Sequence, residues 1–349
     1  MLVFAVTLTA AGLLLTPQML TALATPKELI PQTALYLRIA LGGMLAQLLY
    51  NTASAILRAL GNTTSALHYL AAAVVLNIVL DVLLLFVIPC GIAGAAIATV
   101  AAQYVSALLA LHKLLYLRGV WQLRLHRPFF TPRHLLPILG TSIPAGLQAV
   151  FMSISSLVIQ TYINSFGYAA MAGMTVYARI EGFLYYPLFA FGIALTSFIG
   201  QNVGAHDLIR VRAGLRVSLR IAAGGAMGMA LAAGLAAPTL VTLFTDDPAV
   251  VANALDAVYY TFPFYFLYGI NQIYIGALRG LGDTLYPMMT ALAAYCIFRI
   301  AWCRGWDLIG IHSMHIVYSA YSVSFIVMAV LLYFGCERAL RRSEQQIGA

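Results

Sequence analysis

Glu181 is an acid in the middle of a long apolar segment. It lies about 12 residues after Ala169, near which that segment begins, so in a helix rising 1.5 Å per residue it is roughly 18 Å deep, close to the bilayer midplane. A carboxylate there costs several kcal/mol unless it faces a wet cavity, meets a cation or is protonated. We therefore expect Glu181 to bind a coupling cation or a cationic compound and to change its protonation state, or to form a fixed ion pair with Arg299 or Arg38.

Asn77 and Asp81 form a second polar group in an apolar segment. They are one helical turn apart and so share a helix face. They are expected either to structure the outer half of their bundle or to form part of a transport site. Gln148 follows Pro144 by one turn, and because Pro144 leaves the carbonyl of Gly140 without a donor, the Gln148 amide is expected in a cavity.

Aromatic rings add a possible binding surface in the run YYTFPFYFLY, from Tyr259 to Tyr268. Ring faces attract organic cations, and Tyr265 is the ring of this run that we select as a binding candidate. Most of the other rings are expected to pack against helices or lipid.

Reactive clusters are missing from the sequence. His312 and His315 have a spacing that suits part of a metal site, but no third ligand follows them, and Asp256 and Asp307 are expected to be solvated at outer helix ends. The sequence contains no HExxH, no GxSxG and no paired aspartates. We expect neither an enzyme nor a cofactor other than a coupling proton or sodium ion.

The elements that carry these residues are membrane helices. Of the 349 residues, 62% are hydrophobic and 9% charged, and the mean hydropathy is +0.91, which excludes an ordinary soluble protein. Apolar residues come in blocks and do not alternate, so the prediction is an all-α polytopic membrane protein. Ten transmembrane helices are expected, near 1–24, 30–57, 65–88, 92–117, 135–163, 169–200, 210–244, 249–278, 285–306 and 312–337.

The net charge of +8 is explained by membrane topology and not by nucleic acid binding, because the basic residues cluster in particular loops. The positive-inside rule makes these loops cytoplasmic, together with the C-terminus. We expect the protein to lie in the plasma membrane of a bacterium, the inner membrane, with the lipid bilayer as its partner. The basic residues are Lys113, Arg118, Arg124, Arg127 and Arg133, then Arg210, Arg212, Arg216 and Arg220, then Arg338, Arg341 and Arg342.

An internal repeat relates two parts of the chain. LRALGNT at 57–63 returns as LRGLGDT at 278–284, and the offset of 278 minus 57, or 221 residues, also relates Pro17 to Pro238 and Thr21 to Thr242. Gly61 and Gly282 are expected to end their helices in a left-handed conformation. Arg58 and Arg279 would anchor those ends, a role more architectural than one in gating.

The repeat predicts two pseudo-symmetric bundles of unequal size. The first, at 1–128, has four helices and a basic linker, and the second, at 129–349, has six helices and a short basic tail. A parent of six plus six helices would explain this, with two helices missing at the front. The chain is expected to be a monomer or to be completed by another chain.

Several motifs resemble the multidrug and toxic compound extrusion (MATE) family of antiporters. They are ASAILRALGNT at 53–63, NIVLDVLLLFVIPCGIAGAAIATVAAQ at 77–103, SIPAGLQ at 142–148, FAFGIALTSFIGQNVGAHDLIRVR at 189–212 and IGALRGLGDT at 275–284. The resemblance implies the family's last ten helices. It also implies export of organic cations or other amphipathic compounds, by proton- or sodium-coupled antiport with alternating access. A lipid-linked oligosaccharide flippase of the same fold and a non-transporting fragment remain the alternatives.

Overall fold

The computed structural model describes residues 2–22, 30–117, 122–123 and 132–348, and every regular element in these ranges is helical. The predicted linker arginines Arg118, Arg124 and Arg127 lie outside the described residues. The chain divides into two compact units, Met1–Phe129 and Phe130–Ala349. Within the described ranges, eight helices are long and apolar enough to cross a membrane, and Ala5–Gln18 is a shorter apolar helix.

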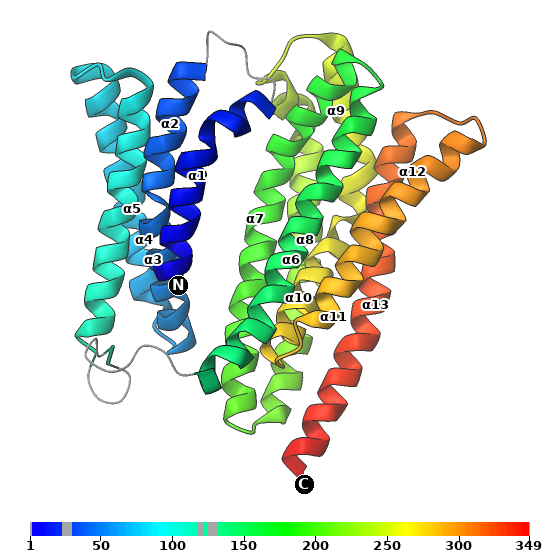
Figure 1. Ribbon diagram of the computed structural model, residues 1–349. Coiled ribbons are helices and arrows are strands. Elements are labelled where there is room, and N and C mark those ends of the chain that lie inside the picture. Colours follow the sequence, from blue (N-terminus) through cyan, green and yellow to red (C-terminus); the bar gives the residue numbers. More distant parts are fainter. Residues whose placement is uncertain (1, 23–29, 118–121, 124–131, 349) are drawn as a thin grey trace. The chain divides into compact units, whose positions relative to one another are not determined.

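In the N-terminal unit, α5 packs against α2, α3 and α4, and α1 packs against α2 and α3 (Figure 1). The helix is interrupted between α2 and α3 at Gly43, where an added Cβ would lie 2.6 Å from Val100 Cγ2 of α5. Close contact with α5 therefore requires a residue without a side chain. The elements are α1 (Leu2–Ala22), α2 (Ile30–Gly42), α3 (Met44–Ala59), α4 (Thr63–Val82), the π-helical turn η1 (Leu83–Val87) and α5 (Gly91–Leu115).

The C-terminal unit is built around α10, which packs against α7, α8 and α13 (Figure 1). Its first elements are α6 (Pro132–Asn164), α7 (Tyr168–Gly204), α8 (Leu208–Thr242), α9 (Pro248–Thr261), the 3₁₀ turn η3 (Phe262–Phe264) and α10 (Tyr265–Gly280). After α10 follow α11 (Leu285–Ala291), the π-helical segment η4 (Leu292–Phe298), α12 (Arg299–Leu308) and α13 (Met314–Gly348).

Among the described residues, joining the interrupted helices gives the expected ten helical stretches, eight of which are long and apolar enough to cross a membrane. α2 with α3, α4 with η1, α9 with η3 and α10, and α11 with η4 and α12 each form one continuous stretch, which with α1, α5, α6, α7, α8 and α13 gives ten. The interruption at η3 was not predicted, but it contains Pro263, which cannot donate a backbone hydrogen bond.

The two copies of the repeated turn have the same backbone geometry. Gly61 and Gly282 adopt φ of +81° and +87°, the left-handed conformation expected from the sequence. The next residues also match, because the N–H of Asn62 donates to the Leu57 carbonyl at 2.8 Å and that of Asp283 to the Leu278 carbonyl at 2.9 Å. The turn therefore returns intact at the 221-residue offset found in the sequence.

The same offset relates the proline turns of α1 and α8. The hydroxyl of Thr21 donates to the carbonyls of Pro17 at 3.1 Å and Gln18 at 2.8 Å. The hydroxyl of Thr242 donates to those of Pro238 at 3.1 Å and Thr239 at 3.0 Å. In each helix a threonine thus donates back to the carbonyls three and four residues earlier.

Candidate functional site

The C-terminal unit contains a cavity of about 990 Å³, which we call the C-terminal cavity. Its walls come from α6, α7, α10, η4, α12 and α13. The charged groups that line it are Glu181, Arg279 and Arg299. The full lining is Ala145, Gln148, Ala149, Met152, Ser153, Ser156, Leu157, Gln160, Glu181, Tyr185, Phe189, Tyr268, Gln272, Ile275, Arg279, Tyr295, Arg299, Tyr321 and Phe325.

Glu181 lies on α7 and faces the C-terminal cavity, which is one of the environments considered for this acid from the sequence. Its Oε1 accepts a 3.1 Å hydrogen bond from the hydroxyl of Tyr265 at the start of α10. Tyr265 itself is fully buried and does not line the cavity, so its expected role as a ring for an organic cation is replaced by that of a hydrogen-bond donor. The Tyr265 hydroxyl holds the Glu181 carboxylate in place.

A direct ion pair with Arg299 was one alternative for Glu181, and within the described part of the C-terminal unit none is formed. The ion pairs within 4.0 Å among the described residues join Arg212 to Glu337 and Glu344, and Asp307 to His312. Arg299 is nevertheless close enough to attract the Glu181 carboxylate electrostatically.

Arg299 is buried in a box of aromatic rings. Its guanidinium carbon lies 4.3 Å from the ring centre of Tyr321, 4.6 Å from that of Tyr295 and 5.7 Å from that of Phe325. Its Nε donates to the hydroxyl of Ser324 at 2.8 Å. The faces of these three rings are thus already used by a cation of the protein itself.

The π-helical segment η4 sets the positions of Tyr295, one ring of the box, and of Arg299, the cation inside it. It contains Tyr295 and ends one residue before Arg299. A π-helical turn widens the backbone and rotates the following residues relative to an α-helix. Asn271 of α10 fixes the segment from the other side, since its Nδ2 donates to the Tyr295 hydroxyl at 3.2 Å and to the Phe325 carbonyl at 3.1 Å.

Gln148 and Arg279 meet at the end of the cavity nearest the LRGLGDT turn. Nη2 of Arg279 donates to Oε1 of Gln148 at 2.9 Å, so the amide expected in a cavity is found there. The Nε of Arg279 is buried and has no hydrogen-bond partner among the described residues. Arg279 therefore does more than anchor the end of α10, which was the role that the sequence suggested.

A wall of stacked rings lies along the same cavity, between α7 and α10. The ring of Tyr185 stacks on that of Tyr268, with centres 5.4 Å apart, and on that of Phe189 at 5.8 Å. Gly192 and Gly276 allow this wall to form, because a Cβ on Gly276 would lie 2.3 Å from the Gly192 carbonyl oxygen. α7 and α10 are therefore in backbone contact just beyond the rings.

Asn77 and Asp81 lie on α4 of the N-terminal unit and so outside the C-terminal cavity. The Nδ2 atom of Asn77 and the Oδ1 atom of Asp81 are both buried without a hydrogen-bond partner among the described residues. Buried polar atoms without partners are costly and uncommon in folded proteins. The Asp81 oxygen is therefore a candidate for binding a proton or a cation, whereas the Asn77 N–H calls for an acceptor.

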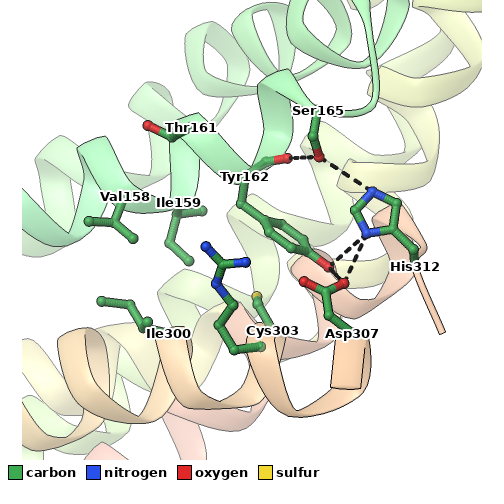
Figure 2. A pocket seen from close by; sticks show the side chains of 10 residues that line it. Val158, Ile159, Thr161, Tyr162, Ser165, Ile300, Cys303, Asp307 and His312 are labelled. Carbon is green, nitrogen blue, oxygen red and sulfur yellow. Dashed lines mark hydrogen bonds and ion pairs between the residues drawn. The ribbon is translucent and has the colours of Figure 1, made fainter. Parts of the chain in front are cut away.

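A second pocket of about 450 Å³ lies where α6 ends, and Figure 2 shows its polar side. Oδ1 of Asp307 accepts from the Tyr162 hydroxyl at 2.7 Å and lies 2.9 Å from Nδ1 of His312. Nε2 of His312 in turn lies 3.3 Å from the hydroxyl of Ser165. Asp307 is thus hydrogen-bonded to two side chains, and it stays partly exposed near the end of α12, as the sequence led us to expect.

Ser165, His312 and Asp307 follow one another like a catalytic triad, but Ser165 is not placed as a nucleophile. The Ser165 hydroxyl donates to the Tyr162 carbonyl at 2.7 Å, so it caps the end of α6. The ring of His315 stacks on Tyr260 with centres 4.8 Å apart and is not near a shared ligand position with His312. No cluster of three or more His, Cys, Asp or Glu suited to a metal occurs among the described residues.

Sequence reasoning missed the contribution of Arg279 and of the Tyr185–Phe189 wall to the cavity. A signal existed for the first, since Arg279 belongs to the repeated motif. For the wall, the spacing of Tyr185 and Phe189 by four residues puts both on one face of α7.

The fold is that of a multi-pass membrane transporter. Over the whole of this chain and 78% of the other, it matches the crystal structure of "MATE in the bent conformation" with a TM-score of 0.92 at 19% identity, which shows the fold alone. The MatE family model matches residues 1–83 and 144–303. The chain therefore belongs to the MATE family, a family of transporters and not of enzymes.

Two relatives from Bacillus subtilis (strain 168) illustrate the relationship. The chain is 34% identical over 299 residues to the "Probable multidrug resistance protein YpnP", covering 83% of this chain and 65% of that protein. It is 26% identical over 340 residues to the "Probable multidrug resistance protein YoeA", covering 94% of this chain and 72% of that protein. The chain thus spans slightly less than two thirds of YpnP.

Proposed function

We propose that this protein exports amphipathic organic compounds across a bacterial cell membrane, as a secondary active antiporter. The C-terminal cavity would hold the compound, and inward flow of protons or sodium ions would drive its release. Alternating access, in which the two bundles change their relative orientation, would expose the cavity to each side in turn. The basic loops favour a cytoplasmic C-terminus.

The C-terminal cavity is the observation that carries the proposal. A volume of about 990 Å³ is at the upper end of the range for sites that take drug-sized molecules. Its lining combines apolar side chains, stacked rings and a few polar groups, which suits compounds with an apolar body and one polar end. Membership in the MATE family and the names of the Bacillus relatives support multidrug export.

The coupling site is proposed at Asn77 and Asp81. A proton or sodium ion at the Asp81 carboxylate would satisfy the buried Oδ1 atom that lacks a partner. The oxygen of the Asn77 amide could serve as a second ligand, because oxygen ligands suit small hard cations. The carboxylate of Glu181 would instead line the cavity that takes the transported compound, with Tyr265 holding Glu181 and Gln148 holding Arg279 in place.

Everted membrane vesicles from cells that express the chain test this proposal. A panel of fluorescent amphipathic compounds is added under an imposed proton gradient and, separately, a sodium gradient, and accumulation is followed. We expect one gradient to drive accumulation, and Asp81→Asn to abolish it. Asp256→Asn is the matched control, because Asp256 is an exposed acid on α9 and outside both sites.

Two results would contradict the proposal. Vesicles that accumulate no compound of the panel under either gradient would remove the export function. Gradient-driven accumulation that is unchanged in Asp81→Asn would remove the coupling site and leave export in place.

A further inference from the structure

We infer that the C-terminal cavity binds an aromatic organic anion, with the anionic group at Arg279 and the ring system along Tyr185 and Phe189. This rests on the proposed function, in that an exported compound is taken to bind in this cavity. It goes further by giving the charge and shape of that compound.

The charge balance of the cavity is the first reason. Two guanidinium groups, Arg279 and Arg299, line it against one carboxylate, Glu181. Neither arginine has a carboxylate within 4.0 Å among the described residues. The described lining therefore carries one more positive than negative charge, and a bound anion would balance it.

The aromatic box is the second reason. Cation–π attraction to Tyr295, Tyr321 and Phe325 is already used by Arg299. An organic cation that entered the cavity would find these faces taken and would meet two like charges. One oxygen of the Glu181 carboxylate already accepts from Tyr265, which leaves the other oxygen to attract a cation. The remaining attraction would come from the ring wall of Tyr185 and Phe189.

Arg279 is the better placed of the two arginines for direct contact with an anion. Arg299 is only 8% exposed and is enclosed by rings. Arg279 is half-buried, and among the described residues the side-chain acceptor that it contacts is the neutral Gln148. Its buried Nε–H has no acceptor among the described residues, so its hydrogen bonds are incomplete. The Nη groups of a guanidinium can donate to the oxygens of a carboxylate.

The shape of the cavity selects a ligand with rings attached to the anionic group. Tyr268, Gln272, Ile275 and Arg279 follow one another along the cavity face of α10. Tyr268 and Arg279 are roughly 16 Å apart at 1.5 Å per residue. The wall that Tyr268 forms with Tyr185 and Phe189 therefore lies beside the path to Arg279, where a ligand ring can stack.

A pair of probes with opposite charge tests the inference. Pyrenebutyrate and pyrenepropyl-trimethylammonium share the ring system and a spacer of three methylenes and differ in the charged group. Binding of each to the purified chain is measured by equilibrium dialysis in nanodiscs of phosphatidylcholine, with empty nanodiscs as background. We expect the anion to bind at least ten-fold more tightly than the cation.

Substitutions that remove one charge from the cavity should change the affinity for pyrenebutyrate in a direction set by the sign of that charge. Arg279→Gln and Arg299→Gln should each weaken pyrenebutyrate binding about ten-fold, and Glu181→Gln should strengthen it about three-fold or more, because each changes the charge of a low-dielectric cavity by one unit. Arg342→Gln, at an exposed position on α13, makes the same change in net charge outside the cavity and should leave binding unchanged.

Gln148→Glu separates loss of binding from loss of folding. The new carboxylate has nearly the shape of the amide and stands against Arg279, so it would supply the missing negative charge from the protein itself. We expect this variant to keep or raise the melting temperature of the wild type and to lose pyrenebutyrate binding.

The inference is overturned if the cationic probe binds as tightly as the anionic one, or if Gln148→Glu binds pyrenebutyrate like the wild type. Binding is measured without a gradient, so it is independent of export. Charge-dependent binding without any export would contradict the proposed function alone. Export together with binding that ignores these charges would contradict the inference alone.

Discussion

The hydroxyl of Tyr265 donates a 3.1 Å hydrogen bond to Oε1 of Glu181, across the interface of α10 and α7. Tyr265 is fully buried at the first position of α10, immediately after the 3₁₀ turn η3. The turn and the carboxylate are thus linked through one ring. A local break in one helix sets the position of an acid on its neighbour.

Tyr265→Phe removes this hydrogen bond and keeps the ring. A hydrogen bond inside a membrane protein contributes about 1 kcal/mol, which corresponds to a fall of about 2–4 °C in melting temperature for a unit of this size. Scanning calorimetry of the purified protein measures the change. Tyr259→Phe, in which the ring is 51% exposed, is the control and should stay within about 1 °C of the wild type. An equal loss in both variants would show that the bond to Glu181 does not stabilise the unit.

Gly276→Ala should destabilise the contact between α7 and α10. The added Cβ would approach the Gly192 carbonyl oxygen to 2.3 Å, and backbone atoms cannot move aside as the end of a side chain can. Overpacking of this kind costs about 1–3 kcal/mol. A Cβ added to Gly224 on α8 would have no atom within 4 Å, so Gly224→Ala should be neutral or stabilising, because alanine favours a helix. Thermal unfolding of the two variants gives the comparison, and a stable Gly276→Ala protein would mean that the two helices are farther apart.

The repeated turns predict equal effects of equal substitutions. Gly61→Ala and Gly282→Ala each place a Cβ at φ near +80°, at a cost of about 1–2 kcal/mol. Asparagine tolerates this conformation better, so Gly61→Asn and Gly282→Asn should each recover part of the loss. Unfolding of the four variants is followed by calorimetry. Losses that differ by more than about 1 kcal/mol between the two positions would show that the copies are no longer equivalent.

The sequence predicted the helices and the repeat because both depend on local patterns. Long apolar blocks end at glycine or proline, and Gly61 and Gly282 keep the same place in the same motif, so helix ends could be located without tertiary contacts. The π-helical segment η4 was not foreseen. Its sequence, LAAYCIF, is apolar like a regular helix, and the contacts that stabilise it come from distant residues, such as Asn271 on α10.

The sequence predicted individual polar residues of the site but not the residues that contact them. Glu181 and Gln148 were found because a polar group in an apolar segment is unusual. Their partners, Tyr265 and Arg279, lie 84 and 131 residues away in sequence, so no spacing rule could pair them. Arg279 was interpreted as an anchor because it lies at a helix end, and whether such a residue faces a cavity depends on how α6 and α10 pack.

The contact between Asp307 and His312, beside the C-terminal end of α6, should contribute little to stability. Their side chains are 22% and 49% exposed and lie 2.9 Å apart, so solvent screens the attraction. A double-mutant cycle with Asp307→Asn and His312→Gln should give a coupling free energy of about 0.3–1 kcal/mol that decreases with added salt. Both variants should bind pyrenebutyrate like the wild type, because neither residue lines the C-terminal cavity. A coupling above about 2 kcal/mol, or a loss of probe binding, would mean that this cluster controls the cavity from a distance.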